Sequence, residues 1–273
     1  MAQTDNRRQS ARIIPLTMRL MTWNVNGLRS ALKKGLPEVL QKIRPQVVLL
    51  QEVRAFPEDL PPPWADPPRW HVVWNPAEKP GYSGTAIWSR SPIEVLETGL
   101  GAPDQEGRVI VARTGGAVVG CLYLPSGSSS EARQTVKDRM LKEFTVWAEP
   151  WRKKAEPVCM AGDFNVAPTE RDIYHWKSNQ KTSGFLPHER AWFANLLQRG
   201  WHDPVRDQAG ERDGPYTWWS NRGQARALDR GWRIDHWLLN EAAKRRCSRP
   251  NVHREHSLGV SDHAPVTIDL DSK

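Results

Sequence analysis

The chain has 273 residues, enough for one large domain or two small ones. Its 26% charged residues and mean hydropathy of −0.65 are typical of soluble globular proteins. No apolar segment approaches the roughly 20 residues that a membrane span requires. Lys and Arg number 39 against 31 Asp and Glu, a net charge of +8. This excess indicates a polyanionic partner, nucleic acid or anionic lipid headgroups, although solubility alone would also explain it.

The first residues differ in character from the rest of the chain. Residues 1–17 are polar and basic without the apolar core of a signal peptide, so we expect a disordered basic tail; an arm that contacts phosphate is the alternative. No repeat or linker divides residues 18–273, which we expect to form a single catalytic domain. Cys121, Cys159 and Cys247 lie far apart, two of them in apolar runs, which indicates core thiols in a reducing compartment.

Apolar runs and helical spacing predict strands interleaved with a few helices. One helix is expected over 32–43. The Ser-x-x-Glu pattern at 128–131 predicts a capping box at the start of the next helix, whose apolar stripe we assign to the core. A third helix, over 192–197, is expected to end at Gly200. The predicted strands cover 19–23, 46–52, 85–88, 108–112, 117–122, 158–161, 237–239 and 266–270.

A polar motif follows the apolar run 158–161. Gly162 removes the side chain where the backbone turns. Asp163 and Asn165 then point to one side, since residues two apart share a face of an extended chain. A carboxylate can activate water, and an amide can hold an anion or orient a nucleophile. Taken alone, these residues would also fit a Gly-Asp turn capped by Asn.

Other predicted strands also end or begin at polar residues. In antiparallel neighbours the start of one strand lies beside the end of the other, so these residues are expected to share one rim. They are Asn24, Glu52, Tyr123, Asp163 and Asn165 at strand ends, with Asp235 and His263 near strand starts. This pattern predicts a four-layer α/β sandwich, in which two mixed β-sheets pack face to face and helices lie outside.

Glu52 is the candidate metal ligand. It ends a buried strand, where a carboxylate is costly unless it is paired or bound to a metal ion. Exposure to solvent at the strand end is the alternative. Carboxylate and amide oxygens suit Mg²⁺ or Mn²⁺, whereas the spacings do not support a His-Cys metal site.

The other rim residues supply acid–base chemistry. Asp163 can take a proton from a water molecule oriented by Asn165. His263, oriented by Asp235, can carry positive charge toward a phosphoryl oxygen. Tyr123 can donate a hydrogen bond to charge that develops in the transition state. A metal, a base and a cationic group together indicate a phosphodiesterase or a phosphomonoesterase.

The ordered set of motifs resembles the exonuclease III family of apurinic/apyrimidinic endonucleases, within the endonuclease/exonuclease/phosphatase superfamily. An ordered set is far more specific than any single motif. The resemblance covers 18–270. Its motifs occupy 23–29, 50–52, 81–84, 104–110, 123–125, 162–165, 185–190, 232–235 and 261–265.

The resemblance implies a role for each matched position. Asn24 is similar to a residue that supports the Asp235–His263 pair. The implied catalytic residues are Asp163, Asn165, His263, Asp235, Tyr123 and Asn24. The implied metal residues are Glu52, Asn26 and Asp262. The implied DNA contacts are Arg29, Arg54, Tyr82 and Asn179, together with Trp218, Trp232 and Ile234 around the flipped-out abasic sugar; ordinary core packing is the alternative for the tryptophans.

The function that the resemblance implies is base excision repair. We expect a Mg²⁺-dependent monomer, with Mn²⁺ as a possible substitute, that cuts double-stranded DNA 5′ to an abasic site and leaves a 3′-hydroxyl. The same site is expected to trim blocked 3′ ends. No membrane partner is expected, and the expected location is cytoplasmic and nucleoid-associated. The alternatives are another superfamily activity, such as a general nuclease, an inositol-phosphate phosphatase or a sphingomyelinase, and a damage binder with an inactive site.

The chain departs from the family pattern at several positions. Asn26 stands where many relatives carry Asp, which makes the metal site less negative. Arg54 replaces the usual Lys, exchanging a compact charge for a planar fork. Residues 126–128, Ser-Gly-Ser, replace a larger amide residue and the wedging arginine that follows it in some relatives.

Overall fold

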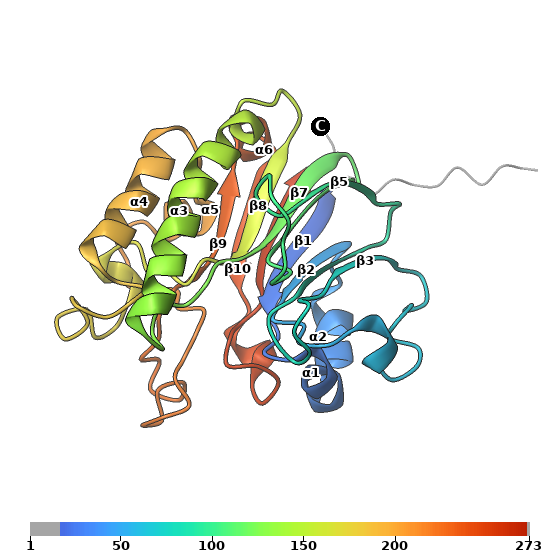
Figure 1. Ribbon diagram of the computed structural model, residues 1–273, viewed down its shortest axis with the longest axis horizontal. Coiled ribbons are helices and arrows are strands. Elements are labelled where there is room, and N and C mark those ends of the chain that lie inside the picture. The colour runs from blue at the N-terminus through green and yellow to red at the C-terminus, as the bar shows by residue number, and fades with distance from the viewer. Residues whose placement is uncertain (1–16, 272–273) are drawn as a thin grey trace, which may run out of the picture.

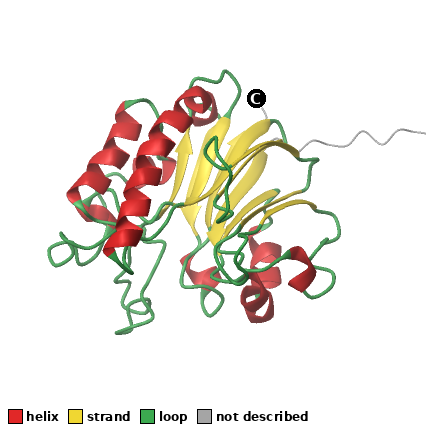
Figure 2. Cartoon of the chain, viewed as in Figure 1, coloured by secondary structure: helices red, strands yellow, loops and turns green. Residues whose placement is uncertain are grey.

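The computed structural model describes residues 17–271. Residues 1–16 of the predicted tail lie outside the described residues, and Thr17, which we assigned to the tail, instead begins the first strand. Two β-sheets pack face to face, and helices cover their outer surfaces (Figures 1 and 2). The predicted four-layer α/β sandwich is therefore confirmed. None of the described helices is long and apolar enough to cross a membrane.

The first sheet has the strand order β10-β11-β1-β2-β4-β3. It is mixed, because β1 pairs parallel with β2 and antiparallel with β11. Its strands are β1 (Thr17–Asn24), β2 (Val47–Gln51), β3 (His71–Asn75), β4 (Thr85–Ser89), β10 (Cys247–Val252) and β11 (Val266–Asp271).

The second sheet has the order β5-β6-β7-β8-β9. It is also mixed, because β7 and β8 are parallel and the other neighbours antiparallel. Its strands are β5 (Glu94–Thr98), β6 (Val109–Thr114), β7 (Ala117–Tyr123), β8 (Val158–Asp163) and β9 (Asp235–Leu239).

Alternation along the strands divides the core into layers. On β2, Leu49 belongs to the core between the sheets, and its neighbour Leu50 packs toward the outer helices. Cys121 and Cys159 are buried free thiols in the core between the sheets, as predicted. Because both faces of β2 and β8 are covered, these strands are apolar on both sides until they reach the rim, where polar side chains begin.

The helices cover both outer faces. The helices α1 and α2 pack on the first sheet, and α3 and α4 lie side by side on the second (Figure 1). The helices are α1 (Leu28–Lys34), α2 (Leu36–Ile43), α3 (Glu131–Arg152), α4 (Pro187–Gln198), α5 (Pro204–Ala209) and α6 (Glu241–Lys244), with short 3-10 turns at Pro57–Asp59, Glu170–Asp172 and Arg254–Ser257.

Two helix predictions were wrong in detail. The single helix expected over 32–43 is two helices, because Gly35 adopts a left-handed conformation (φ 114°) that ends α1 and begins α2. The capping box expected at 128–131 does not form. The N-cap of α3 is Ser130, whose Oγ accepts a hydrogen bond from the amide of Arg133 at 3.2 Å, so Glu131 is the first helical residue rather than the third.

A buried ionic cluster ties the loop after β8 to the start of β9. The Nε atom of Arg233 lies 2.6 Å from Oδ1 of Asp172, and its Nη1 atom lies 2.6 Å from Oδ2 of Asp203. All three side chains are almost fully buried, so each charge depends on the others for the interactions that water would supply. The cluster fixes the segment that leads from Trp232 to Asp235.

Removal of the central cation is therefore expected to be costly. Arg233→Met leaves two buried carboxylates without their main counter-ion and should lower the free energy of unfolding by about 3–5 kcal/mol. The control is Arg113→Met, which removes a solvent-accessible guanidinium that pairs with Glu94 and Glu156 and should cost far less than the loss of Arg233. Urea unfolding at neutral pH measures both; equal losses would contradict the role of the buried cluster.

Candidate active site

Gly162 lets β8 carry a carboxylate to the rim. Its φ is 151°, and a Cβ atom there would lie 1.8 Å from the carbonyl oxygen of Leu122 on β7, so only glycine fits. In the register of the second sheet, Tyr123, Asp163 and Asp235 stand side by side on three adjacent strands. The predicted convergence of strand ends and strand starts is thus found at this edge.

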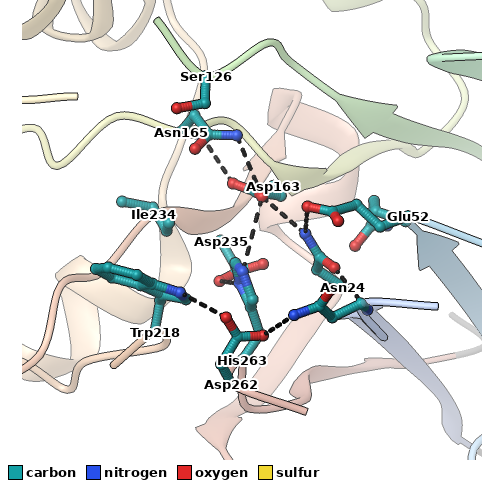
Figure 3. A network of polar contacts seen from close by, with 12 residues as sticks. Asn24, Glu52, Ser126, Asp163, Asn165, Trp218, Ile234, Asp235, Asp262 and His263 are labelled. Atoms are coloured by element: carbon teal, nitrogen blue, oxygen red, sulfur yellow. Dashed lines mark hydrogen bonds and ion pairs between the residues drawn. The ribbon is translucent and has the colours of Figure 1, made fainter. Parts of the chain in front are cut away.

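Asp163 lies at the centre of a hydrogen-bond network (Figure 3). The backbone amide of Asn165 donates to Oδ1 at 2.9 Å, and the Asn165 side-chain amide donates to Oδ2 at 3.2 Å. The side-chain amide of Asn165 also donates to the carbonyl oxygen of Leu124 at 2.9 Å. Asn165 therefore holds the carboxylate of Asp163 in one orientation from both oxygens, and its expected role in orienting water stays a prediction.

Asn24 joins the two sheets. Its Nδ2 atom lies 2.9 Å from Oε1 of Glu52, which follows β2, and 2.9 Å from Oδ2 of Asp163, which ends β8. Its Oδ1 atom accepts a hydrogen bond from the amide of Asn26. The amide hydrogens of Asn24 are directed to these two carboxylates, so its expected support of the Asp235–His263 pair stays a prediction.

His263 and Asp235 form a buried pair from opposite sheets. Nδ1 of His263 lies 2.9 Å from Oδ2 of Asp235, and Nε2 lies 3.9 Å from Oδ2 of Asp163. Oδ1 of Asp235 is buried without a hydrogen-bond partner among the described residues. The carboxylate thus orients the imidazole so that its other nitrogen faces Asp163 and the pocket (Figure 3).

The charges of this group differ from those of the same residues in water. Burial raises the pKa of Asp163 to about 7, and the carboxylates of Asp235 and Glu52 add to the rise while His263 opposes it. Burial alone would lower the pKa of His263, but Asp235 outweighs it and raises the pKa to about 10. At neutral pH His263 is therefore an imidazolium, while Asp163 is poised to bind or release a proton.

Tyr123 and Arg54 approach Glu52 from two directions. The Tyr123 hydroxyl donates to Oε1 of Glu52 at 2.7 Å, and the guanidinium of Arg54 pairs with Oε2. Burial raises the pKa of Tyr123 well above its usual value, and the charge of Glu52 adds to this, so the phenol stays protonated. Glu52 is buried and paired, which excludes the alternative of a freely solvated strand end.

Asn26 and Asp262 form a separate pair beside Glu52. The Nδ2 atom of Asn26 donates to Oδ1 of Asp262 at 2.9 Å, and Nε1 of Trp218 donates to Oδ2 at 3.1 Å. Burial would raise the pKa of Asp262, but the charge of His263 and these two hydrogen bonds lower it. The carboxylate of Asp262 is therefore ionised at neutral pH.

Three rim residues have strained backbones. Asn26, Glu52 and Asn165 have φ values of 47°, 51° and 53°, in the left-handed region that glycine favours. Such strain persists only where the surrounding structure holds it in place, and it concentrates at functional sites. Each of these residues lies one or two positions beyond the end of a strand, where the chain turns at the rim.

A pocket of about 270 Å³ opens onto these groups. One wall is aromatic and apolar, formed by Trp218, Trp232 and Ile234, with the two indole rings edge to face at 6.2 Å. The polar wall is formed by the hydroxyl residues Ser126, Ser128, Thr182 and Ser183. The sequence did not reveal it, because isolated hydroxyl residues in loops carry no pattern. The pocket is lined by Asn26, Glu52, Arg54, Tyr123, Ser126, Ser128, Asp163, Asn165, Thr182, Ser183, Gly184, Trp218, Trp232, Ile234, Asp262 and His263.

Three predicted DNA contacts lie outside this pocket. Arg29 is exposed in the first turn of α1. The Tyr82 hydroxyl accepts hydrogen bonds from Arg108 and Arg133 at 3.0 and 2.9 Å. The Asn179 side chain donates to the carbonyl of His175 at 2.8 Å. Their roles in binding DNA stay predictions.

Comparison with known proteins matches this geometry to one family. Residues 21–263 match the Endonuclease/Exonuclease/phosphatase family. An exodeoxyribonuclease of Bacillus subtilis is 35% identical over 257 residues, 92% of this chain and 98% of that protein. A DNA-(apurinic or apyrimidinic site) endonuclease of Dictyostelium discoideum is 30% identical over 259 residues, 93% of this chain and 71% of that protein.

A solved structure agrees. The 3′ phosphatase NExo from Neisseria, bound to a product DNA hairpin, has a TM-score of 0.85 and 31% sequence identity over 93% of this chain and 99% of that one. This chain belongs to the endonuclease/exonuclease/phosphatase family. The resemblance to exonuclease III-type enzymes that the sequence indicated is confirmed by the family match and by these relatives.

Enzymes of this family depend on a divalent metal ion, and the described residues contain a candidate site for one. Ligand atoms of Asp163, Asp235 and His263 lie within 4.8 Å of one another. Since His263 is an imidazolium at neutral pH, it already supplies a cation to the two carboxylates. Glu52 offers an oxygen-only alternative at the pocket, where the guanidinium of Arg54 balances its charge. These oxygen donors fit a hard divalent cation.

The raised pKa of His263 predicts a pH dependence of stability. A group whose pKa is about 10 when folded and 6.5 when unfolded contributes stability that is present in full below pH 6.5 and is lost as the pH rises toward 10. Asp235→Asn removes the main cause, so its free energy of unfolding should fall less than that of the wild type between about pH 7 and about pH 9.5. Chemical unfolding in EDTA at both pH values measures this; parallel losses would contradict the assignment.

Proposed function

We propose that this protein is a divalent-metal-dependent DNA repair nuclease that cuts double-stranded DNA 5′ to an abasic site and leaves a 3′-hydroxyl, and that trims blocked 3′ ends at the same site. The observation that carries the proposal is the position of Asp163, between the two asparagine amides and the imidazolium of His263, at the floor of a pocket with an aromatic wall. Relatives named as exodeoxyribonuclease and as apurinic or apyrimidinic site endonuclease support both activities.

Asp163 acts as the general base. With a pKa near 7, its carboxylate can take a proton from water at neutral pH without being too weak a base. The amides of Asn24 and Asn165 hold the two carboxylate oxygens, so the lone pair that accepts the proton keeps one direction. A water molecule in the pocket beside Asp163 is thereby aligned for attack on phosphorus.

His263 and Tyr123 stabilise the charge that develops. The imidazolium of His263 presents Nε2 to the pocket and can donate to a phosphoryl oxygen, while Asp235 keeps the ring charged and oriented. The protonated phenol of Tyr123 lies at the same opening, where its single hydrogen is held by Oε1 of Glu52, and it becomes a second donor to the phosphate when it exchanges that bond. A donor fixed before the reaction, as His263 is, stabilises the transition state without the reorganisation that water would need.

We assign the metal site to Glu52, with Asn26 and Asp262 as neighbouring oxygen donors, and Mg²⁺ as the ion, with Mn²⁺ as a substitute. A bound ion would polarise the phosphoryl oxygen and neutralise charge on the phosphate. The residues themselves keep the site in place, because Tyr123 and Asn24 both donate to Oε1 of Glu52 and leave Oε2 directed to Arg54. A metal ion that enters would compete with Arg54 for the carboxylate of Glu52, and a phosphate would compete with Glu52 for the guanidinium of Arg54.

The aromatic wall supports a preference for abasic DNA. A sugar without its base leaves the helix more easily than an intact nucleotide, whose extrusion costs a few kcal/mol more. Trp218, Trp232 and Ile234 bound a pocket of about 270 Å³ that suits an apolar-faced sugar rather than a nucleotide with its base. The net charge of +8 favours a polyanion, and a related phosphatase structure holds a DNA hairpin. We propose that the enzyme works as a monomer on nucleoid DNA.

Asp163→Asn tests the base. The amide keeps the size of the carboxylate but cannot accept the proton, so cutting of an abasic duplex should fall on the order of 10²–10⁴-fold while DNA binding is retained. Single-turnover assays in Mg²⁺ and binding titrations in EDTA measure the two effects. Near-native cutting would move the role of base to another residue.

Trp232→Ala tests the pocket. Trp232 is half-buried and lines the pocket, so truncation should lower abasic cutting while activity at undamaged recessed 3′ ends holds or rises, with little change in melting temperature. If Trp232 were ordinary core, its loss would cost roughly 3–5 kcal/mol and both activities would fall together. A melting curve beside the two-substrate assay separates these outcomes.

A further inference from the structure

A buried lysine lies directly behind the site. Lys137, on the inner face of α3, is fully buried, and its Nζ atom lies 2.8 Å from the backbone carbonyl oxygen of Asn165 and 2.5 Å from Oε1 of Glu189 on α4. A lysine is almost never fully buried unless it is paired. Because the carbonyl of Asn165 receives this charged donor, one side of the residue is held from the protein interior while its amide groups face Asp163.

Glu189 links Lys137 to the loop at Gly184, which lines the pocket. Its Oε2 atom accepts hydrogen bonds from the amides of Gly184 at 2.6 Å and Leu186 at 3.0 Å. Gly184 lines the pocket. The Lys137–Glu189 pair therefore connects α3 and α4 to two segments that form the site: the turn after β8 and the loop at Gly184.

The geometry of Asn165 depends on being held. Its φ of 53° is strained for a residue with a side chain. The contact between Lys137 and the carbonyl oxygen of Asn165 restricts rotation about the Cα–C bond of Asn165. This restriction helps to fix the directions of the backbone amide and the side chain of Asn165. A shift there would move both hydrogen bonds to Asp163 at once.

A contribution to folding stability is a weak explanation for the buried Lys137–Glu189 ion pair. Removing two charges from water is expensive, and a buried ion pair is often no more stabilising than an apolar pair of similar volume. Lys137 also lies on the same face of α3 as Leu141 and Phe144, which pack into the core of the second sheet. An apolar residue at 137 would continue that core, but it could not hold a carbonyl oxygen.

We propose that Lys137 and Glu189 are positioning residues, which hold the strained backbone of Asn165 and thereby orient Asp163 for catalysis. This inference rests on the proposed function of Asp163 as the base. Neither residue touches substrate. Lys137 acts through Asn165, and Glu189 acts by fixing Lys137 and the loop at Gly184.

The experiment compares three variants with the wild type. Lys137→Met removes the donor to Asn165 and keeps the apolar length of the side chain. Glu189→Gln leaves Lys137 able to donate to Asn165. The matched control is Leu141→Ala, which truncates a buried residue one turn further along α3 and leaves Asn165 untouched. Melting temperature, single-turnover cutting of an abasic duplex, DNA affinity in EDTA and hydrogen exchange of residues 164–168 are measured for each.

The expected pattern separates positioning from stability. Lys137→Met should lower the cutting rate about 10–100-fold at unchanged DNA affinity, because misplacement of a reacting group has effects of this size. Leu141→Ala should lower the melting temperature at least as much, yet keep the rate within about twofold where it is folded. Glu189→Gln should lose less activity than Lys137→Met. Only the Lys137 variant should speed exchange at the Asn165 amide beyond the control.

Equal losses of rate in Lys137→Met and Leu141→Ala, with equal exchange at 164–168, would overturn the proposal. Failure of the proposed function is distinguishable, because the wild type would then bind the abasic duplex without cutting it. Hydrogen exchange would still report on whether Lys137 holds Asn165. Faster exchange only in Lys137→Met would support positioning, and unchanged exchange would refute it.

Discussion

The two hydrogen bonds from the side-chain amide of Asn24 are the contact on which the site depends. They bring together carboxylates from different sheets, Glu52 after β2 and Asp163 at the end of β8. Two further contacts cross the same gap, from Tyr123 to Glu52 and from His263 to Asp235. The sandwich therefore positions the chemistry, because the Asn24–Asp163, Tyr123–Glu52 and His263–Asp235 contacts each take one member from each sheet.

This arrangement concentrates negative charge where little water can screen it. Asp163 and Asp235 are buried close to Glu52, and the consequences are the raised pKa of Asp163 and the raised pKa of His263. The imidazolium and the guanidinium of Arg54 offset part of that charge. A site with this balance offers ligands for a cation and a group that can transfer protons near neutral pH, and metal-dependent phosphodiester hydrolysis uses both.

The rim could be predicted from the sequence because its signal is local. An apolar run that stops at a polar residue, as at Asp163, indicates the end of a buried strand. Parallel neighbours bring such ends to one edge, and an antiparallel neighbour adds its start there, as β9 does with Asp235. The contact of Asn24 with Asp163 could not be predicted in this way, since it depends on the distance between two sheets. Lys137 also escaped prediction: a lysine within a helix resembles a solvated position, and only tertiary packing places it against Asn165.

The break between α1 and α2 also could not be predicted from a local pattern. The apolar spacing over 32–43 continues through Gly35, so the periodicity alone predicts one helix, and the left-handed turn at Gly35 appears only in the structure. The polar wall at Ser126 and Ser183 is formed by loops far apart in the sequence, and nothing in their composition marks them. Such loops shape the pocket, whereas the strands position its reacting groups.

We propose that this rim cuts DNA at abasic sites when a divalent metal ion is supplied. To test this, Mg²⁺ is added to the wild-type protein bound, in EDTA, to a duplex with one abasic site, and the ends of the cut strand are mapped beside an undamaged duplex. We expect one cut 5′ to the abasic site with a 3′-hydroxyl, dependent on the ion. Binding without cutting in both Mg²⁺ and Mn²⁺, or internal cutting of both duplexes at equal rates, would contradict it.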